Sequence, residues 1–225
     1  MKIRLSVQNS DPTNWIYRII EKYHFESTDY GLLGKIYEQV QAVLEPSATY
    51  RLNHRMTGLA MIDNAQVAIV AMTLGSGIDG LKERYLSKEQ LTEAYMVDCL
   101  ANEILLDLYQ EFNQSYAKFH RRYVKRYVFV GDEISPTEIP IILNDIRGNK
   151  DTEEICSNEY GVLTPSKSVV FYAILTENPN QVCEGICVNC SNTSCDNYRI
   201  SDKDEKSLST EQPVNYGYMR IFGQS

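Results

Sequence analysis

Hydrophobic residues in the first part of the chain recur with the spacing of one short strand followed by two helices. Ile3, Leu5 and Val7 alternate with polar residues, and this period of two predicts a strand over residues 2–8. Asp11 and Pro12 suit the N-cap and first position of a helix, and a second apolar stripe predicts another helix over about residues 29–45. The two stripes are Trp15, Ile16, Ile19, Ile20 and Tyr23, and then Leu32, Leu33, Ile36, Tyr37, Val40, Val43 and Leu44.

The middle of the chain contains a continuous apolar run and then the longest helical pattern. Residues 67–72 (VAIVAM) are all apolar, which predicts a strand covered on both faces, and Gly75 and Gly77 follow it at a tight turn. Ser87 begins a capping-box pattern, so we expect a long helix from that point through Leu108. Asp98 lies within the apolar stripe of this helix, and we interpret it as a hydrogen-bonded structural carboxylate rather than a catalytic one.

The last third of the chain predicts a helix, two strands and a polar tail. A capping box at Ser135 opens a helix that ends near Gly148, and residues 160–175 read as two strands around a turn at 164–166. Strands and helices do not alternate strictly, so the sequence predicts an α+β fold with a mainly antiparallel sheet. We expect three parts: a body over 1–182, a cysteine-rich segment over 183–199 and a tail over 200–225.

Composition and charge exclude several classes of function. The net charge of -8 disfavours nucleic-acid binding, and the basic residues 121, 122, 125 and 126 are best explained as a solvated helix end. The sequence shows neither a signal peptide nor an apolar run of about 18–20 residues. We therefore expect a cytoplasmic protein that binds neither a membrane nor nucleic acid. No motif for a nucleophile, a P-loop or a dinucleotide site is present, so no catalytic residue is predicted.

Four cysteines near the end of the chain are the strongest chemical signal. Cys183, Cys187, Cys190 and Cys195 lie within thirteen residues. In a reducing compartment, such a cluster favours metal or redox chemistry over disulfides. The spacing predicts a site for Zn²⁺ or for an iron–sulfur cluster and does not choose between them. The alternative is a set of reduced, redox-sensitive thiols. Cys99 and Cys156 are isolated in sequence and receive no function.

Three stretches of the chain resemble the activation domain of vitamin B12-dependent methionine synthase, in its stand-alone bacterial form. The first is the two-helix opening over 15–44, and the second runs from the Thr-Leu-Gly at 73–75 to the segment around Asp98. The third is Pro-Ser-Lys-Ser-Val at 165–169, followed by the cysteines and Arg199. Together these stretches span most of the sequence.

The resemblance implies a C-shaped α+β domain that binds S-adenosylmethionine and contacts a corrinoid (cobalamin) protein. The residues it implies for the cofactor are Arg126, Gly131 and Asp132, with Asp79 as a further candidate. Cobalamin itself would be held by the partner. In this chain the Pro-Gly-Tyr of the family's S-adenosylmethionine segment is replaced by Val-Phe-Val at 128–130, which is stiffer and bulkier.

Two functions therefore stay open at this point. The first is an accessory protein of corrinoid-dependent methyl transfer, a methyltransferase component in the manner of the methionine synthase reactivation domain. The second is a non-catalytic metal- or Fe–S-binding protein for interaction or electron transfer on the same fold. The altered segment at 126–132 and the intact cysteines favour the second.

Overall fold

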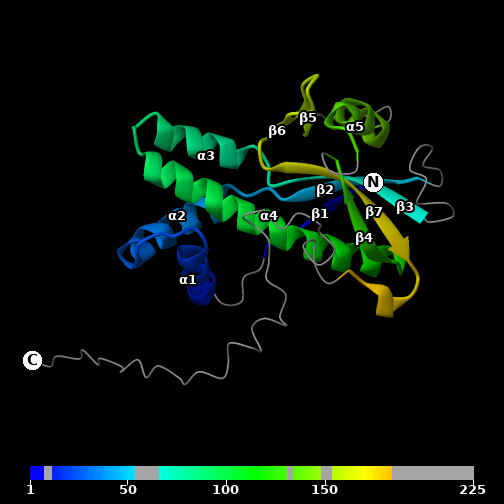
Figure 1. Cartoon of the computed structure of the whole chain (residues 1–225), viewed down its shortest axis with the longest axis horizontal. Helices are drawn as coiled ribbons and strands as arrows, with labels where there is room; N and C mark the ends of the chain where they lie inside the picture. Colours follow the sequence, from blue (N-terminus) through cyan, green and yellow to red (C-terminus); the bar gives the residue numbers. More distant parts are fainter. Residues whose placement is uncertain (8–11, 54–65, 131–133, 148–153, 184–225) are drawn as a thin grey trace, which may run out of the picture. The chain divides into compact units, whose positions relative to one another are not determined.

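A five-stranded antiparallel sheet forms the centre of the molecule, with the strand order β1-β2-β3-β7-β4 (Figure 1). The computed structural model describes residues 1–7, 12–53, 66–130, 134–147 and 154–183. The predicted α+β class and antiparallel sheet are confirmed. The strands are β1 (Lys2–Arg4), β2 (Ser47–Asn53), β3 (Gln66–Thr73), β4 (Tyr123–Phe129) and β7 (Ser168–Thr176), and a separate hairpin pairs β5 (Cys156–Ser157) with β6 (Leu163–Thr164).

Five α-helices in the described residues cover the two faces of this sheet unequally. They are α1 (Pro12–Lys22), α2 (Tyr30–Val43), α3 (Gly77–Leu86), α4 (Leu91–His120) and α5 (Ile139–Arg147), with 3-10 turns η1 (Ser27–Asp29), η2 (Pro136–Glu138) and η3 (Pro179–Gln181). The first four helices pack on one face of the sheet, and α5 packs on the other beside the β5–β6 hairpin (Figure 1). None of the helices in these described segments is long and apolar enough to cross a membrane.

Strand β3 belongs to both hydrophobic cores, which explains its continuous apolar sequence. Ala68, Val70 and Met72 face the larger core under α1 to α4. Val67, Ile69 and Ala71 face the smaller core under α5. Every residue of β3 after Gln66 is buried, so the predicted strand with two covered faces is confirmed. Because successive side chains alternate between the faces of a sheet, a strand with both faces covered has no polar face.

The apolar stripes of α1 and α5 are also confirmed, whereas Leu32 of the predicted second stripe is 36% exposed on α2. The predicted positions Trp15, Ile16, Ile19 and Ile20 are buried in α1. In α5 the buried residues are Ile139, Ile142, Leu143 and Ile146, and the Ser135 side chain accepts a hydrogen bond from the Thr137 backbone N–H, as expected of an N-cap. Strand β1 is shorter than the predicted 2–8, because its ladder with β2 ends at the pair Arg4 and Ser47.

The predicted start of the long helix at Ser87 is wrong. Ser87 is the C-cap of α3, and α4 begins only at Leu91, after Gln90. The sequence pattern did not reveal α3, because Gly77 and Gly80 lower its helix propensity. Tertiary packing overrides that propensity, since Ile78 and Leu81 of α3 are each only 1% exposed.

Candidate functional site

The turn between β3 and α3 lies in close contact with the end of α2. Gly75 has a φ of 89°, in the left-handed region that favours glycine, and its N–H donates to the Thr73 Oγ1 at 3.0 Å. A Cβ atom on Gly77 would lie only 2.3 Å from the carbonyl oxygen of Val43. The two glycines are therefore required by the close approach of backbone segments, and they place the N-terminal end of α3 beyond the end of the central strand β3.

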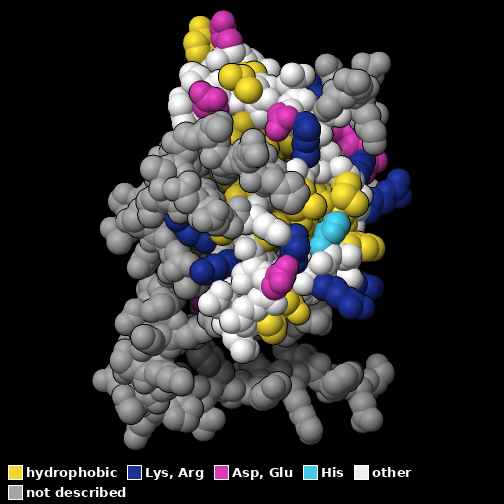
Figure 2. Space-filling model, turned by 90° about the vertical axis from the view of Figure 1, so that its right-hand side faces the viewer, with side chains coloured by type: hydrophobic (Ala, Val, Ile, Leu, Met, Phe, Trp, Pro, Cys, Tyr) yellow, Lys and Arg dark blue, Asp and Glu magenta, His cyan; other side chains and the backbone are white. Residues whose placement is uncertain are grey.

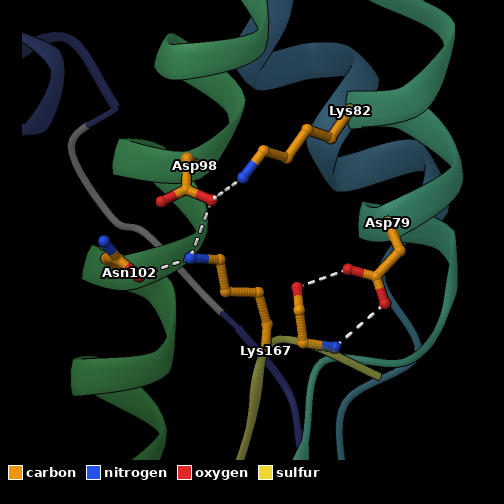
Figure 3. A network of polar contacts seen from close by, with 6 residues as sticks. Asp79, Lys82, Asp98, Asn102 and Lys167 are labelled. Atoms are coloured by element: carbon orange, nitrogen blue, oxygen red, sulfur yellow. Dashed lines mark hydrogen bonds and ion pairs between the residues drawn. The ribbon is translucent and has the colours of Figure 1, made fainter. Parts of the chain in front are cut away.

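A polar network connects α3, α4 and the segment that leads into β7 (Figure 3). The Lys167 Nζ lies 3.0 Å from the Asp98 Oδ1 and donates to the Asn102 Oδ1 at 2.7 Å. The Lys82 Nζ donates to the same Asp98 oxygen at 2.7 Å. The Lys167 side chain is only 11% exposed. A buried ammonium group needs a charged or polar partner, and here α4 supplies both an acid and an amide.

The two lysines control the ionisation of Asp98. Burial raises the pKa of the Asp98 carboxyl group, but the ammonium groups of Lys82 and Lys167 lower it by more, so the pKa lies below its ordinary value of 3.8. Asp98 is therefore ionised at neutral pH. This geometry agrees with the interpretation of Asp98 as a structural carboxylate, with lysine side chains as its partners.

Asp79 in the first turn of α3 holds the segment that leads into β7. Its Oδ2 accepts a hydrogen bond from the Ser166 backbone N–H at 2.9 Å, and its Oδ1 accepts one from the Ser166 hydroxyl (Figure 3). The predicted cofactor residue Asp79 thus contacts the Pro-Ser-Lys-Ser-Val segment directly. Both carboxylate oxygens of Asp79 are occupied by this contact.

A cleft of about 650 Å³ opens beside the β3–α3 turn. Its size lies within the range of small-molecule sites, roughly 300–1,000 Å³. The walls come from β1, the end of α2, the β3–α3 turn and the β5–β6 hairpin. The lining residues are Lys2, Arg4, Leu5, Leu44, Glu45, Pro46, Ser47, Thr73, Gly75, Ser76, Glu154, Cys156, Thr164 and Pro165.

Charges of both signs line this cleft. Lys2 forms an ion pair with Glu154, which also accepts a hydrogen bond from the Ser47 hydroxyl at 3.5 Å. The side chains of Arg4 and Glu45 are exposed and have no hydrogen-bond or ion-pair partner within the described part of the chain. The cleft therefore offers one guanidinium and one carboxylate for a ligand that carries charges of both signs.

The described structure does not bring the predicted cofactor residues Asp79 and Arg126 together. Asp79 contacts Ser166, just before β7, whereas Arg126 of β4 pairs with Ile174 near the far end of β7. These two points on the chain are eight residues apart, or about 26 Å at the rise of an extended strand. Gly131 and Asp132 lie outside the described residues.

The cysteine segment begins at the outer edge of β4. The Cys183 N–H donates to the carbonyl oxygen of Val124 at 2.8 Å, and the Cys183 side chain is half-buried against the larger core. The β4–β7 register shifts between Val124 and Arg126 at a β-bulge. Cys183 and Arg126, predicted for different roles, are therefore close neighbours. Cys187, Cys190 and Cys195 lie outside the described residues, and the described residues contain no cluster of three or more potential metal ligands.

Basic side chains gather where α4 turns into β4. Helix α4 ends at His120, and Arg121 is its C-cap with a φ of 54°. Arg122 forms an ion pair with Glu177 at 3.0 Å. Figure 2 shows Lys and Arg side chains grouped around a histidine on one face of the molecule. Cations at a helix C-terminus interact favourably with the helix dipole, which accounts for much of this basic group.

The sequence did not reveal the charged residues of the cleft. Arg4 and Glu45 follow no motif, and only the pairing of β1 with β2 and the turn after β3 places them around one cavity. The position of Lys167 directly before an apolar strand did indicate a role, because a lysine that becomes buried there needs a charged or polar partner. No protein-family model matches the chain, and a search of curated protein sequences finds no match.

Proposed function

We propose that this protein is an accessory component of corrinoid-dependent methyl transfer that resembles the methionine synthase reactivation domain. In this role it presents a sulfonium methyl donor, S-adenosylmethionine, to a corrinoid held by a partner protein. Reductive methylation would return an oxidised cobalt centre to its active form, with the electron supplied by a separate protein.

One observation carries this proposal. Segments of the sequence that resemble the activation domain contact one another through their most distinctive residues. Thr73 of the Thr-Leu-Gly motif accepts a hydrogen bond from the Ser168 hydroxyl at 2.8 Å, and Asp98 is paired with Lys167 at 3.0 Å. Residues from separate motifs that form one partly buried network support a shared structural origin for the motifs. The antiparallel sheet agrees with the fold that the resemblance implies.

The charges of the cleft suit this ligand. S-adenosylmethionine carries a carboxylate, an ammonium and a sulfonium group. Arg4 provides a partner for the carboxylate, while Glu45 provides negative charge for the cationic groups. Asp79 binds Ser166 and Asp98 binds Lys167, so the segment 165–167 is held in place. Pro165 of this segment forms part of the cleft wall. Asp79 then acts by positioning that wall, since both its oxygens are occupied by Ser166.

Equilibrium binding of S-adenosylmethionine to the full-length protein tests this assignment. We expect binding with a Kd below about 1 mM, and weaker binding of S-adenosylhomocysteine, whose sulfur is a neutral thioether in place of the sulfonium. Arg4→Ala and Glu45→Gln should each weaken binding by roughly ten- to hundredfold, because a charge-assisted hydrogen bond contributes about 1.5–3 kcal/mol. The matched controls Arg84→Ala and Glu38→Gln, exposed and outside the cleft lining, should leave binding unchanged. Absence of binding to the unmodified protein at millimolar ligand would contradict the proposal.

The corrinoid partner is tested separately. The tagged protein, isolated anaerobically from its own host, should retain a corrinoid-binding protein, detected as stoichiometric cobalt and a corrinoid absorption spectrum. An eluate without cobalt, from cells that contain corrinoid proteins, would count against this role.

The second candidate function is metal or Fe–S binding for interaction or electron transfer, and a specific contact favours it. The backbone bond from Cys183 to Val124 connects the first cysteine of the unit to the sheet, so a centre formed there would be held against a rigid strand. Metal analysis after anaerobic purification should give about one zinc, or the iron of one cluster, per chain. A dithionite-bleachable absorption band would identify a cluster. Less than stoichiometric metal would contradict this function.

A further inference from the structure

A continuous series of aromatic rings crosses the larger core from β4 to α4. The Tyr127 ring lies 5.4 Å from that of Tyr109 and 5.4 Å from that of Phe171, measured between centroids. Phe171 lies 5.8 Å from Phe112, which lies 5.6 Å from Tyr116. All these distances fall within the range of direct aromatic contact, about 4.5–7 Å. The series therefore connects the edge strand β4 to the last turns of α4 without an aliphatic gap.

The far end of the series is a tyrosine paired with a histidine. The Tyr50 ring lies 5.3 Å from the Tyr116 ring, and the Tyr50 Oη lies 2.6 Å from the His120 Nε2. Tyr50 is only 2% exposed, whereas His120 is half-buried at the end of α4. The Tyr116 hydroxyl is buried and has no hydrogen-bond partner among the described residues. Of the two tyrosines, only Tyr50 has a base within hydrogen-bond distance of its hydroxyl.

The near end of the series lies beside the first cysteine of the cluster. Cys183 is bonded through its backbone to Val124, three residues before Tyr127, and packs against the core to which Tyr127 belongs. Burial raises the pKa of Tyr127. The Tyr127 hydroxyl donates to the backbone carbonyl oxygen of Tyr109 at 2.9 Å. Its phenol is thus held neutral, next to a thiol.

The hydrogen-bond partners decide where an oxidised ring is most stable. A phenol that loses an electron becomes a strong acid and must release its proton. The Tyr127 proton faces a carbonyl oxygen, which is a very weak base, whereas the Tyr50 hydroxyl lies within hydrogen-bond distance of an imidazole nitrogen, which accepts the Tyr50 proton when the ring carries its own proton on Nδ1. Burial and the charge of Arg122 lower the pKa of His120 below its ordinary value of 6.5. The imidazole is therefore neutral at pH 7 and can accept the proton.

We propose that this aromatic series removes oxidising equivalents from Cys183 and delivers them to Tyr50, which forms a phenoxyl radical with its proton on His120. The oxidant is a thiyl radical, formed when an oxygen-centred radical such as an alkoxyl radical takes the hydrogen atom of the Cys183 thiol and becomes an alcohol. One electron moves from Tyr50 to the sulfur, which takes a proton from solvent and becomes a thiol again. The Tyr50 proton passes to the His120 Nε2. A soluble thiol or ascorbate then returns one electron and one proton to Tyr50.

This function is protective and is independent of the proposed methyl transfer. It keeps a cysteine needed for the cluster from proceeding to irreversible oxidation products. The partial exposure of His120, in contrast to the burial of Tyr50, gives the proton a route to solvent.

A photochemical experiment on the full-length protein tests the proposal. The other five cysteines are replaced by serine, and a ruthenium polypyridyl photo-oxidant is attached at Cys183. After a flash with an external electron acceptor, electron paramagnetic resonance should detect a neutral tyrosyl radical. With ¹⁵N-histidine labelling, the radical should show a coupling to a histidine nitrogen, as expected of a phenoxyl group hydrogen-bonded to His120.

Substitutions then test which of these residues take part in the electron transfer. Tyr50→Phe removes the phenol that forms the radical, and His120→Asn removes its proton acceptor. Each should lower the radical yield or lifetime by roughly tenfold or more. Tyr127→Phe should lower the yield as well. The control Tyr172→Phe removes a buried tyrosine that belongs to the other core and should have no effect. Equal yields in Tyr50→Phe and the parent, or a radical without histidine coupling, would mean that the rings serve packing only and would overturn the proposal.

Discussion

The Lys167 Nζ lies 3.0 Å from the Asp98 Oδ1 and thereby joins the start of β7 to α4. The pair is unequal in exposure, since the side chain of Lys167 is 11% exposed and that of Asp98 27%. Lys82 donates to the same oxygen from α3. This carboxylate therefore holds three elements of the fold together around one wall of the cleft.

Replacing Asp98 with Asn should destabilise the protein by about 2–3 kcal/mol. The substitution keeps the shape of the side chain but leaves Lys167 without a carboxylate, and breaking a buried pair costs about 3–5 kcal/mol. The partial exposure of Asp98 reduces this cost. Urea unfolding should show a lower midpoint with an unchanged slope. Asp145→Asn is the control, because the pair of Arg51 and Asp145 is exposed and contributes less than about 1 kcal/mol.

The contribution of Asp98 should depend on pH. Its pKa is below 3.8 in the folded protein, because Lys82 and Lys167 outweigh the effect of burial. A lowered folded-state pKa stabilises the protein above the unfolded-state pKa, and this stabilisation is lost as the pH falls through the folded-state pKa. The difference in unfolding free energy between the parent and Asp98→Asn should therefore be constant near neutral pH and shrink below about pH 4. A difference that stayed constant down to pH 2.5, roughly, would contradict the assigned pKa shift.

Gly77→Ala should destabilise the protein by about 1–3 kcal/mol, the usual cost of overpacking. The added methyl group would lie 2.3 Å from the Val43 carbonyl oxygen, so α3 must move away from α2. Because Gly75 and Ser76 line the cleft, ligand binding should weaken too. Thermal unfolding and ligand titration measure the two effects.

Gly80→Ala on the same helix provides the comparison. A Cβ at Gly80 meets nothing within 4 Å, so this change should stabilise the protein by roughly 0.5–1 kcal/mol through helix propensity. If both substitutions had the same effect, the close packing at Gly77 would not be the cause.

Cys99 should be the least reactive thiol among the described cysteines. Burial raises its pKa to about 11, so at pH 8 only about one Cys99 in a thousand is a thiolate. Brief alkylation with iodoacetamide, followed by peptide mass spectrometry, should modify the half-buried Cys156 and Cys183 well before Cys99. After unfolding in urea the three should react at similar rates. Early modification of Cys99 in the folded protein would show that α4 opens locally.

Much of the fold follows from the sequence pattern. The strand at 67–72 and the stripes of α1 and α5 are long, regular and dominated by burial, so periodicity identifies them. Helix α3 was not predicted, because its two glycines weaken the apolar pattern of a helix. Its buried residues are covered by helices that come together only in the folded chain. The capping-box pattern at Ser87 gave a wrong helix start, because it lies between the end of α3 and the beginning of α4.

The candidate site follows much less from the sequence. Lys167 and Asn102 are 65 positions apart, and their contact depends on the pairing of β3 with β7, in which Thr73 lies opposite Ser168. Arg4 and Glu45 reach one cleft only because β1 pairs with β2 beside the β3–α3 turn. Such contacts depend on strand register and helix orientation, which local patterns do not encode. The predicted metal ligands after Cys183 lie outside the described residues and stay a prediction.

Strand β3 contributes alternate side chains to both hydrophobic cores, and it has a strand paired along each of its edges. Its amide groups are therefore protected from exchange with deuterium by both neighbouring strands and by both cores. If α5 unfolded, one face of β3 would become exposed, although the opposite face of the same strand packs against the larger core. The two layers should consequently unfold as one cooperative unit, and β3 should carry the slowest-exchanging amides of the domain.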